Sequence, residues 1–99
     1  MAKPRWQLRK NGRLVGTLTL TEVDMFWSGC HFEPGAAWEE LAPLFAASHD
    51  AWRRGDEGAA LAADEAIHEQ GLVLFPDDGG APMEEFLIRI SGEDARFRY

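Results

Sequence analysis

Apolar and polar residues alternate near both ends of the chain, a pattern typical of half-buried β-strands. At the N-terminal end, strand parity favours a three-residue loop, Lys10-Asn11-Gly12, with Gly12 in the left-handed conformation of a bulge. This loop pairs Leu8 with Leu14 and Trp6 with Gly16, whereas a two-residue Asn-Gly loop would scatter the apolar residues over both faces. Val15 then points away from the core. The residues expected to share the core face are Trp6, Leu8, Leu14, Gly16, Leu18 and Leu20.

The C-terminal hairpin is predicted from a two-residue Gly92-Glu93 loop of type II′. This loop pairs Ile90 with Ala95, Ile88 with Phe97 and Phe86 with Tyr99. All six side chains are expected to face the core.

The apolar spacing becomes helical in the middle of the chain. A first helix is indicated by a 3-4-3-4 spacing, and Pro43 is expected to split or kink it because proline lacks a backbone donor. A linker at residues 55–58 leads to a second helix over residues 59–70, with Gly71 at its left-handed C-cap. Short strands are expected at residues 28–33 and 72–75. The residues that define the first helix are Trp38, Leu41, Phe45, Ser48 and Trp52.

The order of elements, three strands, two helices and two or three strands, predicts the fold class. We expect a single α+β domain over residues 1–99, with an antiparallel or mixed sheet of five to six strands and two helices packed on one face. The other face of such a sheet is left open.

Composition narrows the class of protein. With 45% hydrophobic residues the chain is expected to fold unaided. It contains no run of about 18 apolar residues and, after its basic start, no apolar export segment, so we expect neither a membrane span nor a signal peptide. Cys30 is the only cysteine, and arginine outnumbers lysine eight to two. These features favour a bacterial protein in the reducing cytoplasm.

Charge is distributed unevenly along the chain. Residues 1–16 carry five basic and no acidic residues, so with a net charge of −7 the remainder sums to −12. Strand parity places several arginines on the face opposite the core, where they form a candidate surface for an acidic partner or phosphate. An ordinary solvated sheet face is the alternative interpretation. The arginines are Arg5, Arg9, Arg13, Arg89, Arg96 and Arg98.

Met25, Phe26 and Trp27 are consecutive large apolar residues, and they cannot all point inward from an extended chain. At least one is expected to be exposed, and an exposed aromatic residue is a candidate anchor for a protein interface. We therefore add Phe26 and Trp27 to the candidate partner-binding residues.

The sequence offers no strong catalytic or metal-binding pattern. Glu65 and His68 match half of a di-iron motif, but no second half occurs. Cys30 and His31 are adjacent in a predicted strand, so their side chains point to opposite faces and cannot act as nucleophile and base. No catalytic residue, metal or cofactor is therefore assigned. A small enzyme that uses His31 or His68 with nearby carboxylates stays open as an alternative.

Several short motifs resemble those of small single-domain α+β proteins of actinobacterial type. The motifs are Asp24-Met25-Phe26-Trp27, Phe32-Glu33-Pro34, Pro43-Leu44-Phe45 and Ala95-Arg96-Phe97-Arg98-Tyr99. The resemblance spans most of the chain and implies a one-domain α+β fold. It brings no activity, cofactor or site residue.

These features together favour a small acidic interaction module that binds a protein partner by charge complementarity, as immunity proteins, antitoxins and inhibitors do. The alternative is a binder of an anionic ligand or nucleic acid through the arginine face. Nucleic acid is the less favoured ligand because the net charge opposes it. A homodimer stays open.

Overall fold

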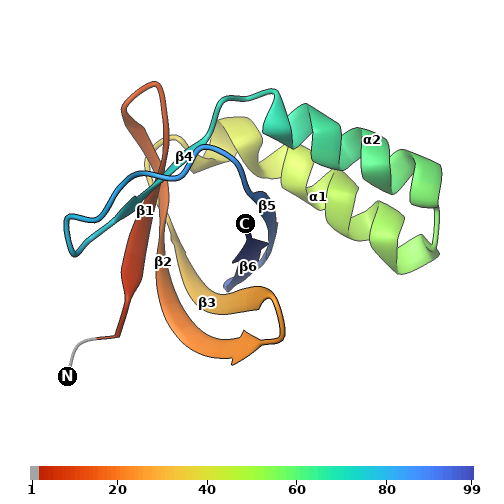
Figure 1. Cartoon of the computed structure of the whole chain (residues 1–99). Coiled ribbons are helices and arrows are strands. Elements are labelled where there is room, and N and C mark those ends of the chain that lie inside the picture. The colour runs from red at the N-terminus through yellow and green to blue at the C-terminus, as the bar shows by residue number, and fades with distance from the viewer. Residues whose placement is uncertain (1–2) are drawn as a thin grey trace.

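The computed structural model describes residues 3–99, which fold in the order β-β-β-α-α-β-β-β (Figure 1). The elements are β1 (Arg5–Lys10), β2 (Arg13–Asp24), β3 (Trp27–Pro34), α1 (Trp38–Arg54), α2 (Glu57–His68), β4 (Val73–Pro76), β5 (Leu87–Ser91) and β6 (Asp94–Arg98). The strands of this part of the chain form one antiparallel sheet in the order β4-β1-β2-β3-β6-β5. The predicted α+β class and its order of elements are confirmed.

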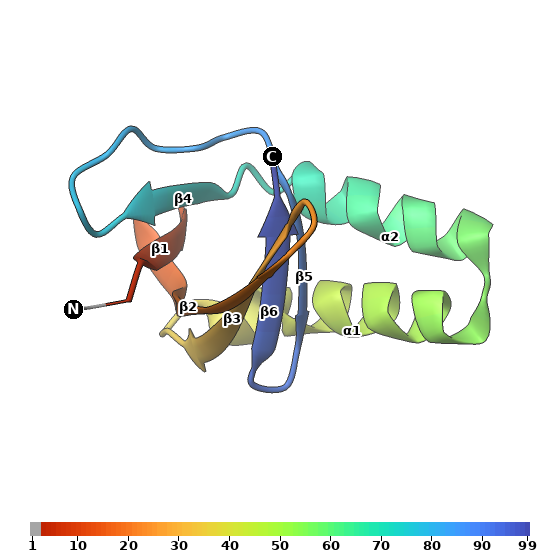
Figure 2. The ribbon, with the colours of Figure 1, turned by 60° about the horizontal axis from the view of Figure 1, so that its bottom comes forward.

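The sheet curls, and the helix pair lies beside its β5 end and projects away from it (Figures 1 and 2). Side chains of β1, β2, β3 and β6 fill the inside of the curl, and Leu41 and Phe45 of α1 pack against them. Ile67 of α2 joins the same core. The helices are thus held to the sheet by one continuous apolar cluster.

The register of the first hairpin differs from the prediction. Asn11 and Gly12 form a two-residue turn with φ of +51° and +78°, as a type I′ turn requires. A bulge then shifts the register, so that Leu8 lies opposite Gly16 and Trp6 opposite Leu18. The bulge turns Val15 into the core, where it is fully buried, so its expected outward position is wrong.

Gly16 is required by the packing of the core. Its missing side chain leaves the space that the ring of Phe32 occupies, where the sequence prediction had placed Trp6. Gly35 has a similar role, because a Cβ there would meet the carbonyl of Leu14. Both contacts lie near the end of β3, just before α1, because Gly16 of β2 lies opposite Pro34 and Gly35 follows Pro34 in the chain.

The first helix continues through Pro43, so of the two outcomes expected there, a split or a kink, the split is wrong. The ring of Pro43 is exposed, and water can therefore satisfy the carbonyl that lacks its helical donor. The helix ends at Gly55, whose φ of +74° is left-handed. Asp56 follows as the N-cap of α2 and accepts a hydrogen bond from the Ala59 backbone N–H at 3.1 Å. The linker is therefore shorter than predicted.

The last hairpin follows its predicted register at two pairs. Ile88 lies opposite Phe97 and Ile90 opposite Ala95, and Gly92 has the positive φ of +61° expected of its turn. The third predicted pair is wrong: the ladder ends at Leu87 and Arg98, and the side chain of Tyr99 is 84% exposed. Tyr99 lies beyond the end of the ladder, whereas Phe86 is half-buried and packs against the core as expected.

Candidate binding surface

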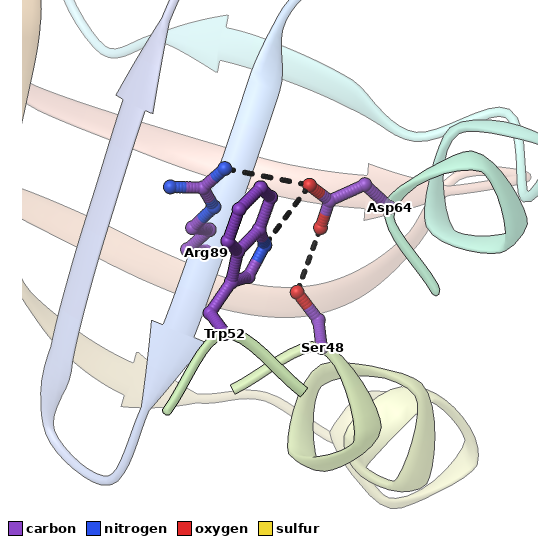
Figure 3. Close-up of polar contacts among 4 residues, drawn as sticks. All are labelled: Ser48, Trp52, Asp64 and Arg89. Carbon is purple, nitrogen blue, oxygen red and sulfur yellow. Dashed lines mark hydrogen bonds and ion pairs between the residues drawn. The ribbon is translucent and has the colours of Figure 1, made fainter. Parts of the chain in front are cut away.

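A polar cluster joins the helices to the edge strand β5, and we call it the Asp64 cluster (Figure 3). Ser48 and Trp52 lie on one face of α1, Asp64 on α2 and Arg89 on β5. The Ser48 hydroxyl donates to Asp64 Oδ1 at 2.7 Å, and the Trp52 indole N–H donates to Oδ2 at 3.2 Å. Arg89 Nη2 lies 3.4 Å from the same Oδ2. One carboxylate therefore links three elements.

Arg89 is held mainly by aromatic rings and this single carboxylate. Its guanidinium carbon lies 4.4 Å from the ring centre of Trp52 and 5.0 Å from that of Trp27, within cation–π range of both. Its side chain is only 24% exposed, and its Nε–H is buried without a hydrogen-bond partner. The expectation that Arg89 lies on a bare sheet face is wrong, because the curl of the sheet brings β5 against the helices.

The two arginines of β6 also lie beside the Trp27 ring. We call Trp27, Arg96 and Arg98 the Trp27 face. Arg96 lies 4.8 Å and Arg98 5.7 Å from the Trp27 ring centre. Both arginines are exposed. No carboxylate of residues 3–99 comes within 4.0 Å of either guanidinium. These two cations are thus available to an external anion.

The arginines of the first hairpin are engaged separately. Arg13 pairs with Glu40 at 2.8 Å, and Arg5 lies 3.8 Å from Asp77. Arg9 donates to the side-chain oxygen of Gln7 at 2.6 Å and to the Gly12 carbonyl at 2.7 Å. Strand β3 lies between this hairpin and β6 in the sheet order. The sequence analysis placed the six arginines on one basic surface. The structure instead separates the arginines of the first hairpin from those of β6, and each of the former has a partner.

The turn between β2 and β3 is apolar and exposed, and we call Val23, Met25 and Phe26 the hairpin tip. Their side chains are 68%, 84% and 76% exposed. Met25 has a φ of +56°, the left-handed region that L-residues disfavour. The guanidinium carbon of Arg98 lies 6.0 Å from the Phe26 ring centre, so the tip adjoins the Trp27 face.

An open cleft of about 490 Å³ lies between α1 and the strands β2, β3, β5 and β6. Its volume is within the range of ligand pockets. Its lining combines Arg89 and Arg96 with Glu22 and Asp94, so it does not select an anion or a cation by charge alone. The cleft therefore supports no ligand class by itself.

Cys30 lines the same cleft but is almost fully buried. Desolvation raises its pKa from 9.0 to about 11, because burial penalises the thiolate. The thiol therefore stays protonated at neutral pH and is a poor nucleophile.

The candidate histidines do not form a recognisable centre. His68 Nε2 lies 3.8 Å from Glu85, and both side chains are largely exposed. His31 is exposed on β3. Within residues 3–99, no three His, Cys, Asp or Glu side chains are grouped so that they could hold a metal ion.

Sequence reasoning missed the roles of Asp64 and Ser48. Ser48 was placed on the buried stripe of the first helix, and a buried hydroxyl requires a partner. Arg89 stands between two core isoleucines, so alternation gives it an outward, solvated position that requires no partner. The hydroxyl of Ser48 was therefore a signal, but the sequence does not show that Asp64 of a different helix satisfies it.

No family model, curated protein or solved structure matches the chain. The resemblance to actinobacterial-type proteins therefore stays a prediction. Among residues 3–99, no helix is both long and apolar enough to cross a membrane.

Proposed function

We propose that the protein is a small interaction module that binds a protein partner through the hairpin tip. The observation that carries the proposal is the exposure of Val23, Met25 and Phe26 together at one turn. Adjacent exposed apolar side chains are typical of interaction sites, and aromatic residues often anchor such interfaces.

The backbone of the tip supports the same conclusion. The turn has two central residues, and the left-handed first position of such a turn favours glycine. Met25 occupies it at a conformational cost of about 1 kcal/mol. A residue that is both strained and exposed adds little to stability, which favours a role in binding.

Charge assists this docking in our proposal. The chain carries a net charge of −7, whereas the exposed Arg98 adjoins Phe26 of the tip and the exposed Arg96 lies beside the neighbouring Trp27. This asymmetry orients a partner that presents acidic and apolar groups together. In mode of action the protein is then comparable to immunity proteins, antitoxins and inhibitors, and the single cysteine favours action in the cytoplasm.

The test is capture of partners from the native host with three forms of the protein: wild type, Phe26→Ser and Leu61→Ser. Leu61 is a matched control, because it is a 55% exposed apolar residue on α2, away from the tip. We expect the same proteins with wild type and Leu61→Ser, and their loss with Phe26→Ser. Equal capture by all three forms, or no specific capture by wild type at physiological salt, contradicts the proposal.

A further inference from the structure

The Trp27 face brings together more positive charge than the fold neutralises. Arg89, Arg96 and Arg98 all lie within 6 Å of the Trp27 ring centre, and the only carboxylate paired with them among residues 3–99 is Asp64. Asp64 is engaged by Arg89 and by two hydrogen bonds from α1. Arg96 and Arg98 lie beside each other with no carboxylate of residues 3–99 within 4.0 Å of either guanidinium, although Glu22 and Asp94 line the same cleft as Arg96.

We propose that Arg96 and Arg98 form an oxyanion site that takes carboxylates from an acidic segment of the partner, an inference that rests on the proposed function. Like-charged guanidiniums repel each other, and a shared anion relieves that repulsion. A guanidinium also presents a planar fork of donors that fits a carboxylate. The exposed Arg96 and Arg98 retain these donors, since neither makes an ion pair with a side chain of residues 3–99.

The spacing of the two arginines indicates the form of the acidic segment. Arg96 and Arg98 are two residues apart on β6, so their side chains project from the same face, roughly 7 Å apart along the strand. Alternate residues of an extended peptide have the same repeat. Carboxylates at positions i and i+2 of an extended segment would therefore match the two guanidiniums.

Apolar residues flanking those carboxylates fit the surroundings of the site. Phe26 lies beside Arg98 and Leu87 pairs with Arg98 across the β5–β6 ladder, and both side chains are exposed. A long polyanion such as nucleic acid is disfavoured, because it extends beyond the local positive charge into the field of a protein with net charge −7. A short peptide stays within reach of the two guanidiniums and meets little of that field.

The test uses a capped pentapeptide, leucine–glutamate–serine–glutamate–leucine, with its glutamine analogue as the neutral control. Binding to the full chain is followed by NMR through the indole N–H of Trp27, with the other three tryptophans as internal references. We expect the glutamate peptide to bind roughly tenfold more tightly than the glutamine peptide at about 0.15 M salt.

Two double variants, each of which removes two positive charges, test whether the preference for the glutamate peptide depends on Arg96 and Arg98. Arg96→Gln with Arg98→Gln should remove the preference for glutamate, whereas Arg53→Gln with Arg54→Gln, on exposed positions of α1, should retain it. Equal binding of the two peptides, or an unchanged preference in the β6 double variant, overturns the inference.

Inorganic phosphate and a short oligothymidylate are the remaining probes. A Trp27 response to either one without a response to the glutamate peptide overturns the assignment to an acidic segment. Failure of this inference is distinguishable from failure of the proposed function. If capture of host partners is lost with Phe26→Ser but unchanged in the β6 double variant, the tip binds a partner and the oxyanion site does not take part.

Discussion

The Asp64 cluster and the hairpin tip each contain a residue in an unfavourable state: the covered cation of Arg89 and the left-handed Met25. The fold compensates the first and not the second. At the cluster, the mostly covered cation of Arg89 lies between two indoles and faces a carboxylate that is itself fixed by Ser48 and Trp52. At the tip, Met25 is left-handed and 84% exposed, with no such compensation from the fold. The fold thus stabilises the first region with contacts from three elements and leaves the second available to a partner.

A second turn in the same sheet makes the comparison sharper. The β5–β6 turn also has two central residues and a positive φ at the first, but there the residue is glycine, Gly92. The two turns thus share their length and the sign of this angle, but not the chemistry of the residue. Folding alone would favour glycine at both positions.

The largest effect is expected from Asp64→Asn. This change leaves the Arg89 guanidinium mostly covered without a carboxylate, so we expect a loss of about 2 kcal/mol in the free energy of unfolding. Urea denaturation measures it. Glu65→Gln, an equal charge change at an exposed neighbour on α2, should shift stability by less than about 0.5 kcal/mol. Equal effects of the two changes would show that Arg89 does not depend on Asp64.

The next effect is expected from Gly92→Met, which gives the second turn the residue found in the first. A Cβ at Gly92 meets no atom within 4 Å, so the expected loss of about 1 kcal/mol is conformational. Thermal unfolding should show a lower midpoint at unchanged secondary structure by circular dichroism. An unchanged midpoint would mean that methionine at such a position carries no strain in this sheet.

The reverse change, Met25→Gly, should raise the free energy of unfolding by roughly 0.5–1 kcal/mol, because it relieves the left-handed conformation. The same variant should bind partners more weakly, since it removes an 84% exposed apolar side chain. Stability and partner capture measured on one preparation test both. A gain in both, or a loss in both, would contradict the separation of binding from stability at the tip.

The smallest effect on stability is expected from Phe26→Ser, within about 0.5 kcal/mol, because the Phe26 side chain is 76% exposed and contributes little buried area. Urea denaturation checks this expectation alongside the capture experiment. A loss above about 1 kcal/mol would mean that Phe26 belongs to the fold.

The sequence predicts those parts of the fold that depend on local patterns. Strand parity and a glycine turn give the pairs of Ile88 and Ile90, and helical spacing gives the buried stripe that contains Phe45. The register of the first hairpin could not be found in this way, because the bulge at Val15 is favoured by the packing of Phe32 against Gly16. Those contacts bring together residues distant in the sequence, and parity arguments within one hairpin do not include them.

Only part of the candidate site could be predicted from the sequence, for the same reason. Alternation along β6 correctly suggested that Arg96 and Arg98 are exposed. Three consecutive apolar residues correctly suggested that at least one of them is exposed, and the structure exposes Met25 and Phe26. Alternation gave Arg89 the same outward direction, but the curl of the sheet brings α2 and its Asp64 over that position. Curvature is a property of the whole sheet, so the sequence did not show which arginine would be covered.

The close approach of Phe32 to Gly16, and of the Leu14 carbonyl to Gly35, has a consequence for how this protein can diverge. In a saturation library selected only for folding, positions 16 and 35 should retain glycine while most exposed positions vary. A distant homologue with a wholly different surface would then still carry two glycines separated by most of β2, a turn and β3. That pair is a more durable marker of ancestry than any charged or aromatic residue of the binding surface.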